Sequence, residues 1–182
     1  MEREEALKLI KQHVHNDRLI KHMLAVEAIM KALANRLNED EHLWSLVGLL
    51  HDLDYEYTKN NMEKHGLISA EMLKDLLSEE ALDAIRGHNE LTGYKSDKKL
   101  CKALKAADQI SGLIVATALV MPNKTLAEVS VKSLKKKFKQ KDFARGVKRE
   151  KIRLIEELGL SLDEFFELAL EAMKGIRKEL GL

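Results

Sequence analysis

The stretch LVGLLHDLDYE, residues 46–56, joins an apolar run to a histidine and an aspartate that are adjacent in the chain. The apolar residues 46–50 predict a helix in the protein interior, and they lead directly into His51 and Asp52. Successive side chains point about 100° apart on a helix, so both can contact one metal ion only near the helix end. The polar residues from Asp54 onward supply such an end. A His-Asp pair by itself is usually an ordinary polar pair at the surface, but a buried charge needs a partner, so an interior helix that ends in this pair makes it a candidate for metal binding.

Outward from this stretch, nearly the whole chain has the pattern of α-helix. The sequence has one proline and little of the alternation that is typical of strands. Asn38 and Glu41 have the spacing of a capping box that starts the helix just described. The preceding helix is predicted from apolar residues at three- and four-residue spacing, which are Leu19, Met23, Val26, Met30, Leu33 and Leu37. These patterns predict an all-α fold, a helical bundle.

The remaining helices follow from caps, breaks and apolar runs. The polar residues 54–62 and 89–96 predict loops, and Pro122 is expected to end a long helix. Caps are predicted at Thr125, with Glu128, and at Ser161, with Glu164. The expected helices are His65 through Leu77, 79–87, 98–121, a short one near 125, 141–158, and 161 to about 180.

Six side chains form a candidate cluster of nitrogen and oxygen donors. Such a donor set suits one or two divalent ions of Mn, Fe, Co, Ni or Zn and needs no thiolate. A metal held in this way can turn water into a nucleophile at neutral pH. The competing interpretation is ordinary, because helical histidines are common and core acids are often paired by salt bridges. The six residues are His22, His51, Asp52, His65, His88 and Asp108.

Five segments together resemble the motifs of the HD superfamily of metal-dependent phosphohydrolases. The resemblance covers roughly residues 16–118 and rests on matching order and flanking residues. GLIVATALVM and FARGVKRE further resemble a small subgroup of HDIG-like hydrolases. Many relatives have glycine where this chain has Asp54, which leaves the ligands intact but puts the subgroup's substrate in question. The five segments are LIKHML, LVGLLHDLDYE, KHGLISAEML, IRGHNE and KAADQISGLI.

The resemblance implies a ligand set and a reaction. It implies that His22, His51, Asp52 and Asp108 hold one metal, and that Asp52 bridges to a second metal held by His65 and His88. A metal-bound hydroxide would attack the phosphorus of a phosphate ester. The alternative is a single-metal site in which His65 and His88 contact the substrate phosphate. Asp108 or Glu90 would accept the proton of the water or orient a ligand imidazole.

The implied substrate is a nucleotide or another small phosphorylated metabolite, so the enzyme would be a phosphomonoesterase or a phosphodiesterase. Arg18, one helical turn before His22, is a candidate for gripping phosphate, although an ordinary surface arginine is an equal alternative. Tyr55 and Tyr94 lie in expected loops beside ligands, where they would stack on a base or merely cover the site.

Two other function classes compete with the hydrolase. The first is a non-catalytic module that binds metal or nucleotide, which the intact ligand set argues against. The second is an RNA-binding protein that uses the basic C-terminal third, since residues 92–182 hold 20 basic and 12 acidic side chains. The basic segment 132–149 would then bind RNA, form a rim that attracts an anionic substrate, or simply be a solvated helix face. It has no recognised nucleic-acid module, so nucleic acid is not the expected partner.

Composition bounds the remaining properties. We expect one HD-type domain over residues 1–182, with a motif core at about 16–118 and a C-terminal helical extension at about 123–182. The net charge of +1 gives the protein no overall electrostatic attraction to nucleic acid. The single cysteine excludes an intrachain disulfide. The start MEREEALKLI has no apolar signal region, and the longest apolar run is too short for a bilayer. A cytoplasmic protein without membrane contact is expected, and its oligomeric state stays open.

Overall fold

The computed structural model describes residues 1–182, and every regular element in it is a helix. The predicted all-α fold is therefore confirmed. The α-helices are α1 (Arg3–His13), α2 (Asp17–Leu37), α3 (Glu41–Leu50), α4 (Tyr55–Thr58), α5 (Leu67–Leu73), α6 (Glu79–Gly87), α7 (Lys99–Leu119), α8 (Val131–Lys139), α9 (Arg149–Ile152), α10 (Leu162–Gly175) and α11 (Arg177–Leu180). The 3₁₀ helices are η1 (Met62–Lys64), η2 (Glu90–Thr92), η3 (Leu126–Glu128) and η4 (Arg153–Leu158).

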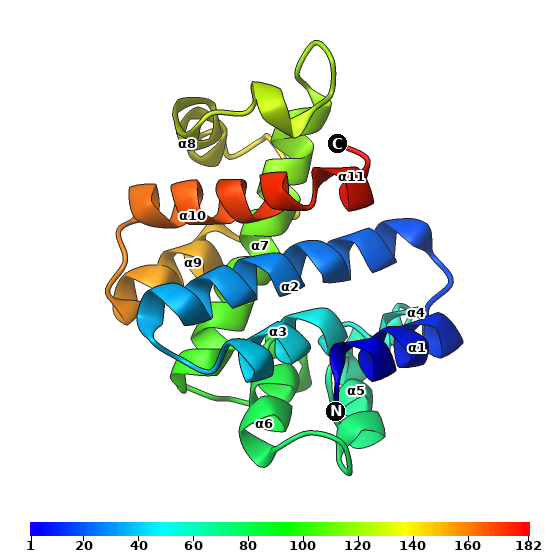
Figure 1. Cartoon of the computed structure of the whole chain (residues 1–182). Helices are drawn as coiled ribbons and strands as arrows, with labels where there is room; N and C mark the ends of the chain where they lie inside the picture. The colour runs from blue at the N-terminus through cyan, green and yellow to red at the C-terminus, as the bar shows by residue number, and fades with distance from the viewer.

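Two long helices, α2 and α7, organise the molecule. In Figure 1 they cross near the centre, with α3 along one side of α2 and α10 along the other. Helices α5 and α6 lie below the crossing, and α8 lies at the far end of α7. The crossing therefore brings a residue in the first turns of α2 close to the middle of α7.

Helix α2 begins and ends at asparagines. The side chain of Asn16 accepts hydrogen bonds from the backbone N–H groups of Arg18 and Leu19, which starts the helix. At the other end Asn38 has a φ of 56°, a left-handed conformation that asparagine tolerates and that ends helices. The predicted capping box of Asn38 with Glu41 is therefore wrong. The residue that caps α3 is Asp40, whose side chain accepts from Leu43 N at 3.0 Å.

Helices α2 and α3 pack at very close range, and Gly48 makes this possible. A Cβ atom at Gly48 would lie 2.8 Å from the carbonyl oxygen of Val26 and 3.0 Å from the Cα of Glu27. Real Cβ atoms essentially never approach that closely, so only glycine fits without a shift of one helix. The predicted stripe of α2 faces this contact and the core, where Met23, Val26 and Met30 are fully buried.

Between α3 and α6 the helices differ in position and length from those expected. Residues 54–62, predicted as a loop, contain α4, and the helix expected from His65 to Leu77 spans only Leu67–Leu73. It starts after Gly66, which has a φ of 95°. His65 therefore lies before its helix. The expected helix 79–87 is confirmed as α6, and His88 follows as its C-terminal cap residue.

The largest difference between the predicted and the observed helices lies in the C-terminal third. The structure has no helix over residues 140–148, where one was expected, and α8 lies just before this loop. The guanidinium of Arg149 donates to six backbone carbonyls of residues 137–147, which fold the loop around it. The predicted Ser161 cap is present, with its Oγ accepting from Glu164 N at 3.1 Å. A break at Ile176 then separates α10 from α11.

One contiguous core of 45 buried hydrophobic residues runs through the molecule. It includes residues of the expected motif core, such as Leu50 and Ile110, and residues of the C-terminal extension, such as Phe165 and Phe166. The extension therefore packs on the helices that carry the expected ligands. No helix of the chain combines the length and the apolar character that crossing a bilayer would require.

Candidate metal centre

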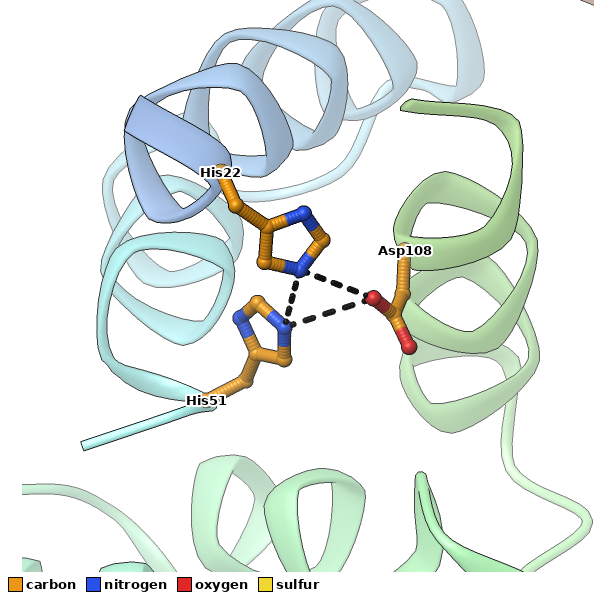
Figure 2. A group of neighbouring side chains, drawn as sticks. All are labelled: His22, His51 and Asp108. Carbon is orange, nitrogen blue, oxygen red and sulfur yellow. Dashed lines mark hydrogen bonds and ion pairs between the residues drawn. The ribbon is translucent and has the colours of Figure 1, made fainter. Parts of the chain in front are cut away.

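Five segments of the chain deliver the six predicted donors to one place. His22 comes from α2, His51 ends α3 and Asp52 follows it, His65 precedes α5, His88 ends α6, and Asp108 lies in the middle of α7. Figure 2 shows His22, His51 and Asp108 pointing toward one another from three different segments. The donors come from positions up to 86 residues apart, so only the tertiary fold can assemble them.

The first group is His22, His51 and Asp108. The Nε2 atom of His22 lies 2.9 Å from Asp108 Oδ1 and 3.3 Å from His51 Nε2. The distance from His51 Nε2 to Asp108 Oδ1 is 3.6 Å. One donor atom from each of the three residues lies within 4.8 Å of the other two, a spacing that a single ion can fill.

The second group is His65, His88 and Asp52. The Nε2 atoms of the two histidines are 3.2 Å apart, and Asp52 Oδ1 lies 3.1 Å from His65 and 3.5 Å from His88. His51 approaches this group as well, with its Nε2 atom 3.3 Å from Asp52 Oδ1. A compatible set of donor atoms is His51, Asp52 and His88.

Asp52 lies between the two groups. Its Oδ2 atom is 3.3 Å from His22 Nε2, and its Oδ1 atom is near His51, His65 and His88. Its side chain is only 9% exposed, so the carboxylate is poorly solvated by water. The two oxygens of one carboxylate can therefore serve two neighbouring ions or a single shared one.

The other ring nitrogen of each histidine has its own partner. The Nδ1 atom of His51 donates to the carbonyl oxygen of Gly48 at 2.8 Å, and that of His88 donates to the carbonyl of Ile85 at 2.6 Å. Because a carbonyl only accepts, these Nδ1 atoms carry the hydrogen. In the neutral ring the lone pair is then on Nε2, which faces the cluster. This is the usual arrangement of histidines that bind metals.

His22 and His65 are held in the same way by side chains. Ser111 Oγ donates to the backbone oxygen of Asp108 at 2.7 Å, so its lone pair faces His22 Nδ1 at 3.3 Å. His65 Nδ1 donates to Asp54 Oδ1 at 2.7 Å. All four Nε2 atoms thus converge on the carboxylates of Asp52 and Asp108. Neutral imidazoles in this arrangement would set lone pairs against lone pairs, and a cation between them removes the repulsion.

The electrostatics of the cluster favour positive charge between the carboxylates. Burial lowers the pKa of His22, but hydrogen bonds and charge from Asp108 and Asp52 outweigh it and raise this pKa to about 10. The pKa of His65 is raised to about 10 in the same way by Asp52 and Asp54. Burial would raise the pKa of Asp108, yet hydrogen bonds from His22 and His51 hold it below its usual value. The cluster therefore demands either protons or metal ions, and the donor set fits divalent metal.

Asp54 contacts the cluster through His65, a contact that the sequence did not predict. It is fully buried, and besides His65 it accepts hydrogen bonds from Gly66 N and Ser69 N, both at 2.8 Å. Burial would raise its pKa, but the hydrogen bond from His65 and the two backbone donors lower it. The available signal in the sequence was an acid two residues after the candidate ligand Asp52, where many relatives have glycine.

Of the predicted substrate contacts, Tyr55 contacts a residue of the cluster. Arg18 is exposed in the first turn of α2, one turn before His22. The ring of Tyr55 meets that of His65 edge-on, with centroids 5.4 Å apart, and Tyr55 is 38% exposed. Tyr94 donates from its hydroxyl to Asp83 Oδ1 at 2.7 Å, which holds the loop before α7. These positions leave the proposed roles as predictions.

Glu90 is held by lysines of the C-terminal extension. Its side chain forms ion pairs with Lys148 and with Lys151, the latter at 2.5 Å. Burial would raise the pKa of Glu90, but the two lysines lower it to about 2. A carboxylate with so low a pKa is a weak acceptor for the proton of a water molecule.

The basic segment 132–149 has two parts. Within α8 the apolar Leu134 and Phe138 are buried, while Lys132, Lys136 and Lys139 are exposed, so this part is an amphipathic helix with a charged outer face. The second part is the loop folded around Arg149. Its Val147 side chain lies toward Gly112 of α7, one turn after Asp108.

Comparison with known proteins gives one family. The family model of the HD domain matches residues 19–113, which is more than half of the chain and spans all six candidate ligands. No solved structure matches the chain.

Proposed function

The chain belongs to the HD domain family, and from this premise we propose that it is a metal-dependent phosphohydrolase. One observation carries the proposal. Four Nε2 atoms converge on two carboxylates, while each Nδ1 atom is held by a partner of its own. Such prior orientation of donors costs folding energy and is typical of sites that bind metal for chemistry.

We assign the ligands by their distances. His22, His51, Asp52 and Asp108 would hold one ion, and Asp52, His65 and His88 would hold a second. Bound metal would supply Lewis-acid stabilisation of the phosphoryl oxygens and would make water a nucleophile at neutral pH. The ions would come from the transition series Mn, Fe, Co, Ni and Zn, which accept nitrogen and oxygen ligands together.

The chain's own residues would orient the reactants. The cluster is most open along His22 and Asp108, whose side chains are 26% and 18% exposed, whereas His51 is fully buried. Substrate would therefore enter beside α2 and α7. Asp108 Oδ2 is contacted by Gln109 Nε2 at 3.4 Å, and we assign this oxygen to accept the proton of the attacking water. We prefer Asp108 to Glu90 for this step because Glu90 is paired with two lysines.

The proposed substrate class is a phosphate ester of a nucleotide or of a small metabolite. Arg18 would contact phosphate, and Tyr55, which lies edge-on to His65, would cover or stack on the organic group. A module that binds metal or nucleotide without catalysis would have the same ligands. Turnover separates these two functions.

The test of this proposal combines metal analysis with hydrolysis of an aryl phosphate in the presence of Mn²⁺. The purified protein is expected to carry a transition metal and to release phosphate, and Asp52→Ala is expected to lose both. The matched control is Asp75→Ala, which removes an exposed aspartate at the end of α5. Full metal content and activity in Asp52→Ala would overturn the proposal, and metal binding without turnover of any ester would favour the non-catalytic module.

Metal counting distinguishes one ion from two. In the two-ion site, His88→Ala lowers the content from about two ions to about one per chain and removes most activity. If His65 and His88 contact only phosphate, His88→Ala leaves the metal content unchanged and mainly raises KM. A count of one ion in the wild type under excess metal, unchanged in His88→Ala, would exclude the second ion while leaving the hydrolase proposal intact.

A further inference from the structure

The segment 148–151 of the C-terminal extension lies against both halves of the donor cluster. Lys151 Nζ donates to the backbone oxygen of the ligand His88 at 3.3 Å. The backbone N–H of Lys148 donates to Gln109 Oε1 at 2.8 Å, and Gln109 follows the ligand Asp108 in α7. One short segment thus contacts the backbone of His88 in one donor group and the residue next to Asp108 in the other. It lies outside the residues that match the family model.

Two lysine ammonium groups of this segment share one acid. Glu90, two residues after His88, pairs with Lys148 through Oε1 and with Lys151 through Oε2. The side chain of Lys151 is only 12% exposed, whereas those of Lys148 and Glu90 are 43% and 45% exposed. Lys151 is therefore anchored, while Lys148 and Glu90 are accessible from solvent. Both ammonium groups contact the carboxylate of Glu90, so an anion that binds the two lysines together competes with this carboxylate.

Arg149 fixes the backbone between the two lysines. Its guanidinium donates to the carbonyl oxygens of residues on both sides of the loop, at distances from 2.6 to 3.3 Å. A partly buried planar group with its donors satisfied in this way leaves the loop little freedom. The positive charge of Arg149 is used inside the loop, so the charges available to a ligand are those of the lysines. The six acceptors are the carbonyls of Lys137, Phe138, Gln140, Phe143, Ala144 and Val147.

We propose that Lys148 and Lys151 bind the dianionic phosphoryl group of a phosphate monoester, and that Glu90 occupies the two lysines until this group displaces it. The inference rests on the proposed function, because it names the substrate class of the same site. It makes Lys148 and Lys151 specificity-determining residues and Glu90 a competitor of the substrate.

Charge explains why a monoester fits this arrangement better than a diester. Glu90 carries one negative charge and is tethered to the site, so it competes at a high effective concentration. A phosphodiester also carries one charge and gains nothing over Glu90 at the two lysines. A phosphate monoester carries two charges near neutral pH and gains additional Coulomb energy in the exchange.

The first experiment measures binding of inorganic phosphate to the metal-loaded protein by titration calorimetry. Lys148→Ala is expected to weaken the phosphate Kd by about tenfold, as expected for loss of a hydrogen bond between charged groups. The matched control is Lys141→Ala, an exposed lysine of the same loop, which is expected to bind phosphate as the wild type does. Metal content and melting temperature are measured on each variant. A phosphate Kd in Lys148→Ala equal to that of the wild type overturns the inference.

The second experiment measures phosphate binding to Glu90→Gln, for which the expected change in Kd is opposite in sign to that of Lys148→Ala. If Glu90 competes for the lysines, its neutralisation tightens phosphate binding by about two- to fivefold, which corresponds to the free energy of an exposed ion pair. If Glu90 instead accepts a proton or orients a ligand, Glu90→Gln lowers kcat and leaves the phosphate Kd unchanged or weaker. Unchanged or weaker phosphate binding in Glu90→Gln therefore also overturns the inference.

The third experiment tests the monoester class without turnover. Phenylphosphonate, a non-hydrolysable dianion at mildly alkaline pH, is expected to displace phosphate from the wild type, and its monomethyl ester, a monoanion, is expected to do so much more weakly. Equal competition by the two compounds would contradict the assignment. Failure of the proposed function is distinguishable, because the wild type would then hydrolyse no ester while the variants still shifted the phosphate Kd in the expected directions.

Discussion

Asp54 determines how His65 faces the cluster. It takes three donors on its two oxygens, from His65 Nδ1, Gly66 N and Ser69 N. Asp54→Asn leaves a single acceptor oxygen and brings an amide N–H₂ against one of these donors, which we expect to destabilise the protein by about 1–3 kcal/mol. If a second ion binds as we propose, the loss of orientation at His65 is expected to weaken its binding by about 10- to 100-fold.

Metal titration of Asp54→Asn checks this expectation, with Asp75→Asn as a control at an exposed position. Binding of the first ion, which does not involve His65, is expected to change much less. Equal affinity for both ions in the wild type and in Asp54→Asn would show that Asp54 has no part in orienting the ligand.

Asp83 gives a pH-dependent contribution to stability away from the cluster. Burial would raise its pKa, but hydrogen bonds from Ser96 and Tyr94 hold it below the usual 3.8. A lowered pKa in the folded state stabilises the protein above pH 3.8, and this stabilisation is lost as the pH falls through the lower folded-state value.

We therefore expect metal-free Asp83→Asn to be less stable than the metal-free wild type at neutral pH, by about 1 kcal/mol. The difference is expected to shrink as the pH falls from 3.8 through the lower folded-state pKa, where the wild-type carboxyl becomes protonated in the folded protein as well. Urea unfolding of both proteins across the acid range measures it. A difference that stays constant down to the acid limit would mean that the ionised form of Asp83 is not what stabilises the loop.

At the scale of elements, the contact of α2 with α3 sets the distance between His22 and His51. Gly48→Ala places a methyl group 2.8 Å from the carbonyl of Val26, so one helix must move. Overpacking of this kind costs about 1–3 kcal/mol. The displacement is also expected to weaken metal binding, because His51 lies three residues after Gly48 and donates to its carbonyl oxygen.

The control for this variant is Gly175→Ala at the end of α10, where a Cβ would have no neighbour within 4 Å. Alanine there is expected to leave stability unchanged or to raise it by about 0.5–1 kcal/mol. Thermal unfolding and metal affinity are measured on both variants. Gly48→Ala with wild-type stability and metal affinity would contradict the importance of this close approach.

The elements also differ in how far local sequence determines them. The stripe of α2, the Ser161 cap and the end of the long helix before Pro122 were predicted from residues close in the chain, because caps and breaks act locally. The helix expected over 141–158 is absent from residues 140–148, because Arg149 binds carbonyls that a helix would have used internally. A competition between one side chain and the backbone ladder is not visible in residue spacing.

At the scale of the whole molecule, metal would join five segments that are also connected by packing and by the hydrogen bonds of the cluster. Ligand that binds the folded state alone adds about 2.7 kcal/mol at a hundredfold excess over its Kd. We therefore expect removal of metal by a chelator to lower the melting temperature by roughly 5–10 °C for a chain of this size. Differential scanning calorimetry, with the metal restored in a second scan, measures the shift. An unchanged melting temperature after verified metal removal would contradict a site that links these segments.

The sequence by itself determined the helical class and the identity of the candidate donors. Apolar spacing depends on residues within a few turns, and the order of His22, His51-Asp52, His65, His88 and Asp108 along the chain is legible without any structure. The family match over residues 19–113 agrees with that prediction. The ligand roles themselves stay predictions until metal is measured.

The tertiary structure decided what the donors are attached to and what surrounds them. Three sets of contacts join residues that are 11 to 89 positions apart in the chain. They are the hydrogen bond of Asp54 with His65, the contact of Ser111 with His22, and the ion pairs of Glu90 with Lys148 and Lys151. No local pattern encodes such pairs, because each depends on the crossing of helices and on the path of the C-terminal loop. Sequence spacing fixes which face of a helix a side chain takes, whereas its partner across the core is fixed only when the helices pack.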